Sequence, residues 1–329
     1  MTASDPRVGD VSEGTILRGI LARLPKSGAL VGPGDDAALI AAPDARVVAT
    51  VDTLVHGPDF RLAWSGAFDL GWKAAAVNLA DVAAMGARPT ALLVALAMPE
   101  DTRLSFVEGL ADGLRAACDA LAPGCAVEGG DLTVSDTLTI AVTALGSLDG
   151  RAPVLRSGAR AGDVVAVAGT LGRAARGLGI LFERFTDASG SPIPIDFGRL
   201  ADQERADLEV QLRPSPPVAL GAIAAAAGAT AMMDVSDGLV LDASRMAAAS
   251  GVCLAIESAA LGADPGAALS GGEDHGLLAT FPPDAPLPEG FRVIGEVRAS
   301  GAEAVTVDGR PHDGRTGWDP YRDWDAGRG

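Results

Sequence analysis

Six short acidic segments of the chain are framed by glycine or by hydroxyl residues. In chain order they read GPGDDAA at 32–38, TVDT at 50–53, NLADVAAMG at 78–86, EGGD at 128–131, MDVSDGL at 233–239 and LSGGED at 269–274. Carboxylate oxygens are the ligands that Mg²⁺ prefers, and glycine lets a ligand approach the backbone closely. Together the segments predict a site in which several Mg²⁺ ions hold phosphate groups.

Each segment taken alone also has an ordinary structural explanation. The pair at 35–36 fits a simple turn, and Ser236 or Asp237 fits a helix N-cap. Asp81 interrupts an alanine-rich helix, where a buried carboxylate needs a cation or several donors, and Lys73 two turns earlier is a candidate partner. These alternatives stay open from the sequence, and the number of clusters is what favours the metal site.

Charge and motif content argue against several other functions. The net charge is −17, so the surface should repel the phosphate backbone of nucleic acids. The histidines His56, His275 and His312 lie in no nucleophile-elbow context. Neither a Cys/His zinc pattern nor a Walker-type phosphate loop occurs. Phosphate chemistry supported by carboxylates and metal ions remains.

The sequence also predicts where the protein works. Charge, glycine or proline interrupts every apolar run before it could span a membrane, and the N-terminal segment lacks the pattern of a signal peptide. The cysteines Cys118, Cys125 and Cys253 are odd in number and unclustered, which is typical of thiols in a reducing compartment. We therefore expect a cytoplasmic protein without nucleic-acid or membrane partners.

Strands and helices must position the acidic segments. Apolar alternation and helical spacing predict strands at 47–55, 90–98 and 138–148, and helices at 69–85 and 104–121. Gly86 should end the first of these helices. The segment EGGD is expected to form a compact turn after a short strand at 125–127.

The chain changes character at 149–163, where glycine, arginine and proline separate two regions of strand and helix patterns. The length of 329 residues itself suggests two domains. We predict an N-terminal domain at 1–149 and a C-terminal α/β domain at 150–329. The fold class is α/β (α+β) rather than a TIM barrel, because the strand–helix rhythm is irregular.

Seven motifs resemble the thiamine-monophosphate kinase family and occur in the order expected for it. They are GDDAA at 34–38, VDTLV at 51–55, NLADVAAMGA at 78–87, GGD at 129–131, RSGARAGD at 156–163, DVSDGL at 234–239 and SGGEDHGL at 270–277. The resemblance extends over nearly the whole chain. Aminoimidazole ribonucleotide synthetase and selenophosphate synthetase, relatives in the wider superfamily, share the acidic motifs.

The resemblance implies a fold and a reaction. The fold would be the two-domain ATP-binding fold of aminoimidazole ribonucleotide synthetase, with the N-terminal domains of a homodimer forming an intersubunit β-barrel. The reaction would transfer the γ-phosphoryl group of ATP to thiamine monophosphate, giving thiamine diphosphate. Its substrates would be ATP and thiamine monophosphate, with several Mg²⁺ ions as cofactor.

Carried over by position, the resemblance also implies roles for single residues. The Mg²⁺ ligands would be Asp36, Thr50, Val51 through its carbonyl, Asp52, Asp81, Asp131 and Asp234, with Asp237 for a further ion. The nucleotide contacts would be Gly130, Asp131, Arg156 and Ser236, and the thiamine contacts Glu273 and Tyr321. Catalysis would rest on Asp36, Asp81, Asp131, Asp234 and Arg156.

One position departs from the family. A histidine usually stands before the residue that matches Phe60, and this chain has Asp59 there, with His56 nearby. If that histidine touches the substrate phosphate, an aspartate needs a metal ion or a proton to replace it. Asp59 is therefore a candidate substrate contact.

Two other functions stay open. One is a sister enzyme of the superfamily that acts on another phosphate-bearing or acyl substrate. The other is a non-catalytic sensor of ATP or of thiamine phosphates, against which the intact set of carboxylates argues.

Overall fold

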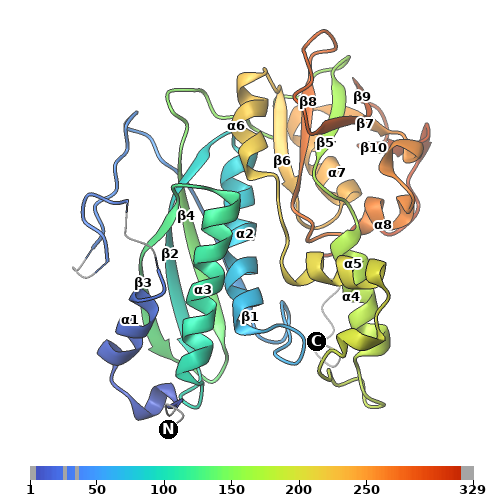
Figure 1. Ribbon diagram of the computed structural model, residues 1–329. Helices are drawn as coiled ribbons and strands as arrows, with labels where there is room; N and C mark the ends of the chain where they lie inside the picture. Colours follow the sequence, from blue (N-terminus) through green and yellow to red (C-terminus); the bar gives the residue numbers. More distant parts are fainter. Residues whose placement is uncertain (1–4, 25–27, 34–36, 320–329) are drawn as a thin grey trace.

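Two separate sheets, each with its own helices, make up the protein (Figure 1). The computed structural model describes residues 5–24, 28–33 and 37–319. Of the predicted site residues, Asp36 and Tyr321 lie outside the described residues. All other predicted site residues can be placed.

The first sheet has four strands in the order β1-β4-β2-β3. Its elements are α1 (Glu13–Leu21), β1 (Val48–Val55), α2 (Ala67–Ala84), β2 (Arg88–Met98), α3 (Leu104–Leu121), β3 (Ala126–Val134) and β4 (Thr139–Ser147). β4 pairs antiparallel with β1 and β2, whereas β2 and β3 are parallel. β1 and β3 form the two edges, so this sheet does not close on itself.

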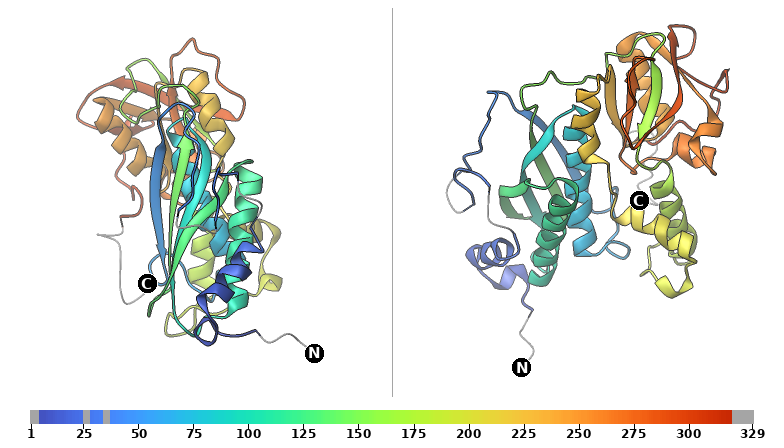
Figure 2. Two further views of the ribbon diagram at one scale, coloured as in Figure 1. Left: turned by 90° about the vertical axis from the view of Figure 1, so that its left-hand side faces the viewer. Right: turned by 45° about the horizontal axis from the view of Figure 1, so that its top comes forward.

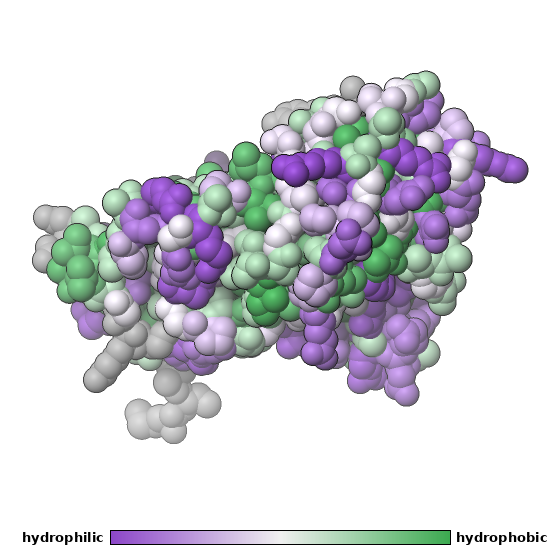
Figure 3. All heavy atoms as spheres, turned by 90° about the horizontal axis from the view of Figure 1, so that it is seen from above, coloured by the Kyte–Doolittle hydropathy of each residue, from purple (hydrophilic) through white to green (hydrophobic). Residues whose placement is uncertain are grey.

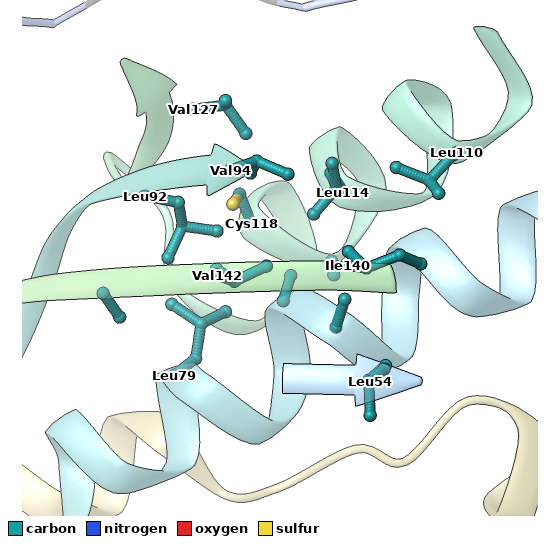
Figure 4. Packing of buried hydrophobic residues seen from close by; sticks show 14 of the residues in the cluster. Leu54, Leu79, Leu92, Val94, Leu110, Leu114, Cys118, Val127, Ile140 and Val142 are labelled. Carbon is teal, nitrogen blue, oxygen red and sulfur yellow. The ribbon is translucent and has the colours of Figure 1, made fainter. Parts of the chain in front are cut away.

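Helices α2 and α3 cover one face of the first sheet and form its core (Figure 4). The labelled core residues are Leu54, Leu79, Leu92, Val94, Leu110, Leu114, Cys118, Val127, Ile140 and Val142. The two helices approach each other closely through glycine. A Cβ on Gly71 would lie 2.0 Å from the carbonyl oxygen of Leu110, and one on Gly113 would lie 2.1 Å from that of Phe68.

The second sheet has seven strands in the order β11-β10-β7-β9-β5-β8-β6. Its strands are β5 (Val164–Ala168), β6 (Ala231–Val235), β7 (Val252–Ile256), β8 (Gly276–Phe281), β9 (Phe291–Ala299), β10 (Val305–Val307) and β11 (Arg310–Pro311). The helices of this half are α4 (Arg173–Arg184), α5 (Asp202–Leu212), α6 (Val218–Ala226), α7 (Leu239–Ser250) and α8 (Pro265–Ser270). All pairings are antiparallel except that of β7 with β10.

Helix α2 joins the two halves of the molecule. It packs on the first sheet and also contacts α5, α6, β6 and β8 of the second half, and we call this contact of α2 the seam (Figures 1 and 2). A Cβ on Gly221 of α6 would lie 2.1 Å from the carbonyl oxygen of Ala83, so the helices nearly touch. Two indole N–H groups from the first half also reach the second: Trp64 donates to the carbonyl of Phe185 at 3.0 Å, and Trp72 to that of Pro214 at 2.7 Å.

The surface mixes polar and apolar residues (Figure 3). Hydrophilic residues gather on the C-terminal half, at the right of that view, with apolar residues between them. Within the described ranges, no helix combines the length and the hydrophobicity that a membrane crossing requires.

The predicted elements of the first half agree with the structure within a few residues. Helix α3 has the predicted bounds, and α2 ends just before Gly86, which adopts the left-handed conformation at φ +72°. The predicted turn at 128–131 is wrong, because this segment continues β3. Gly130 fits there because a Cβ would lie 2.0 Å from the carbonyl oxygen of Val94 on the neighbouring strand. The glycine pair therefore serves close strand packing rather than a turn.

The glycine contacts of α2 and α3 lead to a stability prediction. Gly113→Ala should destabilise the protein by about 1–3 kcal/mol, because the new methyl group overlaps backbone that cannot move aside. Gly179→Ala is the matched control, since its Cβ on α4 meets nothing within 4 Å. The control should be neutral or slightly stabilising. Urea unfolding of both variants is the measurement, and equal midpoints would contradict the packing argument.

Candidate active site

Strand β1 presents two predicted site residues to α2. Thr50 donates its hydroxyl to Asp81 at 2.7 Å, and the backbone amide of Asp52 donates to the side-chain oxygen of Asn78 at 3.0 Å. Strand alternation places Thr50 and Asp52 on the face that α2 covers, whereas the side chain of Val51 points away and is 60% exposed. The valine side chain has no ligand atom, so a role for Val51 would have to use its backbone carbonyl.

Asp234 reaches the same region from the second sheet. It lies near the end of β6, is 8% exposed, and contacts His275 Nδ1 through Oδ2 at 3.1 Å. His275 follows the loop that carries the last acidic segment. The seam thus brings together the carboxylates of Asp52, Asp81 and Asp234, which are far apart in the sequence.

Burial and neighbouring negative charges raise the pKa of Asp81 and of Asp52. Burial raises the pKa of Asp81 to about 7, and the negative charges of Asp234 and Asp52 add to the rise. Burial likewise raises the pKa of Asp52, an effect that His275 partly offsets. The cluster carries more negative charge than the surrounding side chains compensate, which is the condition for binding a cation.

His275 contacts this cluster through Asp234. Burial opposes its protonation, but the hydrogen bond to Asp234 and the charges of Asp234, Glu273 and Asp81 outweigh burial and raise its pKa. Its backbone is in the left-handed conformation at φ +52°, which is unusual for a non-glycine residue. Sequence reasoning noted His275 only as a histidine without a catalytic context. No local signal could reveal its contact with Asp234, 41 residues away.

The loop between β6 and α7 is organised by an aspartate that the sequence analysis missed. Asp242, fully buried on α7, accepts hydrogen bonds from the backbone amides of Ser236, Asp237 and Gly238 at 3.0–3.2 Å. Burial raises the pKa of Asp242 to about 6. Arg245 lies 2.6 Å from both Asp242 and Asp237. The N-cap of α7 is Gly238, without a side-chain bond, so the N-cap explanation for Ser236 or Asp237 is wrong.

Glu273 forms a second polar centre at the seam. Its Oε2 lies 3.0 Å from Lys73 Nζ of α2 and 2.5 Å from Gln211 Nε2 of α5. Partial burial opposes ionisation, but Lys73 and Gln211 outweigh it and lower the pKa of Glu273. The proposed pairing of Lys73 with Asp81 is therefore wrong.

Asp59 lies close to this centre, in the turn after β1. Its carboxylate accepts a hydrogen bond from the backbone amide of Val55 at 2.7 Å. Burial raises its pKa, and the charge of Glu273 raises it further against the opposing effect of Lys73 and Arg61. Asp59 and Glu273, predicted as contacts of one substrate, thus lie within electrostatic reach of each other.

Asp131 and Gly130 lie away from the seam within a single chain. Asp131 pairs in register with Ala95, on the sheet face opposite to the one that α2 and α3 cover, and three strands away from β1. Both residues line a hollow of about 1240 Å³ around the β3 edge, together with residues of α1, β2 and β4. This volume is large enough for a nucleotide.

Arg156 lies at the C-terminal end of α7. Its carbonyl accepts a hydrogen bond at 2.9 Å from Ser250, the last residue of α7. Asp237 stands just before the first turn of the same helix, and 12 helical residues span about 18 Å. Arg156 is therefore remote from Asp237, whereas the carbonyl of the neighbouring Leu155 accepts a hydrogen bond at 3.2 Å from the amide of Met232 on β6, two residues before Asp234.

The donor set suits hard divalent cations, although not as a closed cage. Asp52, Asp81 and Asp234 offer carboxylate oxygens, and Thr50 offers a hydroxyl. Across the described part of the chain, no three acidic, histidine or cysteine side chains converge to hold one ion by themselves. Mg²⁺ typically takes one or two carboxylates and completes its shell with substrate phosphates and water. The open arrangement is compatible with that mode.

Comparison with known proteins connects this arrangement to a family. Residues 34–148 match the family described as AIR synthase related protein, N-terminal domain. A thiamine-monophosphate kinase of Mycobacterium tuberculosis (strain ATCC 25618 / H37Rv) is 43% identical over 307 residues, which cover 89% of this chain and 86% of the relative.

Solved structures agree with the sequence match. The crystal structure of thiamine-monophosphate kinase from Stenotrophomonas maltophilia K279a has 35% identity and a TM-score of 0.74, covering 91% of this chain and 98% of that one. The structure of AaThiL complexed with AMPPCP and TMP has 32% identity and a TM-score of 0.73, covering 95% and 98%. The similarity therefore extends over both halves of the molecule.

The raised pKa of Asp81 leads to a prediction for metal-free protein. The folded pKa of about 7 exceeds the unfolded value of about 3.9, so stability falls as the pH rises between these values. Asp81→Asn removes this ionisation. At pH 8 in a chelator, Asp81→Asn should raise the Tm by about 2–4 °C for each kcal/mol gained, and the gain should shrink as the pH falls and vanish only at about pH 4.

Asp136→Asn serves as the control for this measurement, since Asp136 is exposed on the first half. Its Tm should follow that of the unchanged protein at both pH values. If the Tm of Asp81→Asn at pH 8 is equal to or lower than that of the unchanged protein, the ionised carboxylate of Asp81 does not destabilise the fold.

Proposed function

Because the chain belongs to the thiamine-monophosphate kinase family, we propose that it transfers the γ-phosphoryl group of ATP to thiamine monophosphate, giving thiamine diphosphate and ADP. The observation that carries the proposal is the anionic cluster at the seam, where the pKa of Asp81 rises to about 7 beside Asp52 and Asp234. The AaThiL complex with AMPPCP and TMP supports it, since that protein is similar over nearly the whole chain.

Magnesium ions fit the cluster that this chain provides. Asp52, Asp81 and Asp234 would hold them, with Thr50 fixing the orientation of Asp81 through its 2.7 Å hydrogen bond. Such ions neutralise charge between donor and acceptor phosphates. Asp237 is a less available ligand as the structure stands, because Arg245 lies 2.6 Å from it.

The residues of the chain would bind and align the two substrates. A phosphate monoester is already a nucleophile at neutral pH, so no strong general base is required, and alignment provides most of the catalysis. Glu273 and Asp59 would face the acceptor at the seam. Ser236, in the loop that Asp242 holds, would contact the nucleotide.

A homodimer would account for the residues that lie apart from the seam. The uncovered face of the first sheet carries apolar side chains, among them Val51, which is 60% exposed, together with Asp131. We propose that this face pairs with its copy in a second chain as an intersubunit β-barrel. Gly130, Asp131 and Arg156 would then contact nucleotide bound along the subunit contact.

The remaining assignments follow from this proposal. Residues 1–149 would form the ATP-binding and dimerisation domain, and 150–329 the C-terminal domain. A cytoplasmic location is consistent with the free, buried state of all three cysteines.

An acceptor comparison tests the function directly. With Mg²⁺ and ATP, ADP release should require thiamine monophosphate, should not occur with free thiamine, and should stop when a chelator is added. The product should be identified as thiamine diphosphate. ATP binding without ADP release for either acceptor would overturn the kinase assignment and favour a sister enzyme or a sensor.

The role of the cluster is tested by turnover of Asp81→Asn. Loss of one carboxylate from the proposed Mg²⁺ site should lower kcat by about a hundredfold or more while the fold is kept. Asp136→Asn, an exposed carboxylate outside the seam, should retain kcat. Near-normal turnover of Asp81→Asn would exclude its metal role.

A further inference from the structure

We propose that Lys73 and Gln211 are positioning residues that fix the carboxylate of Glu273, so that one oxygen is anchored and the other is presented to the cationic part of the acceptor. This inference rests on the proposed function and deepens it. It adds two residues that the sequence motifs do not mark and names the chemistry that they select.

Both donors converge on a single oxygen of Glu273. Lys73 Nζ and Gln211 Nε2 lie 3.0 Å and 2.5 Å from Oε2. Among the hydrogen bonds of the described residues, none reaches Oε1, and the side chain is 38% exposed. The carboxylate is therefore held at one oxygen and open at the other.

The two donors come from different parts of the fold. Lys73 belongs to α2 of the first half, Gln211 to α5 of the second, and Glu273 to the loop before β8. Two donors from separate helices fix the position of Oε2. This arrangement forms only when the seam is closed.

The backbone of Glu273 is held as firmly as its side chain. Its amide donates to the carbonyl of Ser236 at 2.8 Å, and its φ of +65° is in the left-handed region. A Cβ on Gly272 would lie 2.2 Å from the same carbonyl oxygen. Strained backbone of this kind persists only where many surrounding contacts hold it in place, and it is concentrated at functional sites.

The burial of Lys73 and Gln211 is costly for purely structural residues. The side chain of Lys73 is 6% exposed, and Glu273 is its one carboxylate partner among the described residues. Gln211 Oε1 is buried without a hydrogen-bond partner in the same part of the chain. Apolar residues of similar size would avoid both costs, so the useful feature is the pair of donors to Glu273.

The open oxygen of Glu273 suits a positively charged ring or an amino group. Thiamine monophosphate offers both, since its thiazolium ring carries a permanent charge and its pyrimidine an exocyclic amine. A carboxylate fixed in advance binds such groups without the entropic cost of ordering. The charge of Glu273 raises the pKa of Asp59, so the two carboxyl groups lie within electrostatic reach of each other.

Steady-state kinetics of three variants test the proposal. Lys73→Met and Gln211→Leu should raise the KM for thiamine monophosphate about ten- to a hundredfold and leave the KM for ATP within about twofold. Arg213→Gln is the matched control. It removes the ion pair with Asp69, 3.4 Å long, which also joins α2 to the second half but does not contact Glu273.

Stability distinguishes positioning from folding. Gln211→Leu deletes an acceptor that already lacks a partner, so its Tm should stay near that of the unchanged protein even if Lys73→Met folds poorly. Adding Gln211→Leu to Glu273→Gln should change the acceptor KM by no more than about twofold, because Gln211 acts through Glu273. An unchanged acceptor KM in Gln211→Leu, or an equal rise for ATP, would overturn the proposal.

A binding measurement tests this inference independently of the proposed kinase activity. If the unchanged protein releases no ADP, titration calorimetry with thiamine monophosphate still decides. Weaker binding by Gln211→Leu, by about ten- to a hundredfold, supports the positioning role even though the kinase assignment fails. Equal binding by both proteins, or binding by neither, overturns it.

Discussion

The contact of α2 with the second half is the constraint on which the rest of the structure depends. This helix is rich in alanine, and Gly71, Gly113 and Gly221 let it approach α3 and α6 almost to backbone contact. Because the helix backbones nearly touch, side-chain rearrangement cannot shift one helix against another. The same helix carries Lys73, Asn78 and Asp81, so the packing that joins the halves also sets the positions of the polar groups.

The second sheet reaches this helix with groups of its own. Asp234 comes from the end of β6, and Glu273 and His275 from the loop before β8. Neither half contains a complete site, because the negative charges that raise the pKa of Asp81 come from both. Substrates held there would lie between two rigid layers, and this geometry favours alignment over side-chain rearrangement.

Much of the first half could be predicted from the sequence because its patterns are strong and local. Helix α3 shows the spacing of an amphipathic helix over its full length, and Gly86 is a clear stop for α2. The segment at 128–131 misled because glycine pairs usually mark turns. Here Gly130 packs against Val94 of a strand more than thirty residues away in the sequence. The residues next to Gly130 in the sequence give no sign of this contact.

Four of the six acidic segments, at 50–53, 78–86, 233–239 and 269–274, have residues at the seam, but the sequence did not show how their charges are compensated. Asp242 and His275 hold their neighbours through contacts that only the folded chain creates. Lys73 appeared as a partner for Asp81 because helical spacing relates the two. Its true partner is Glu273, which local spacing cannot indicate.

The indole groups of Trp64 and Trp72 give the molecule an intrinsic optical probe. Each donates its N–H from the first half to a backbone carbonyl of the second, so each changes environment if the halves separate. The chain contains only four tryptophans and one tyrosine, and these two therefore make up a large share of its ultraviolet emission. Separation of the halves during unfolding can thus be followed by fluorescence in the unlabelled protein.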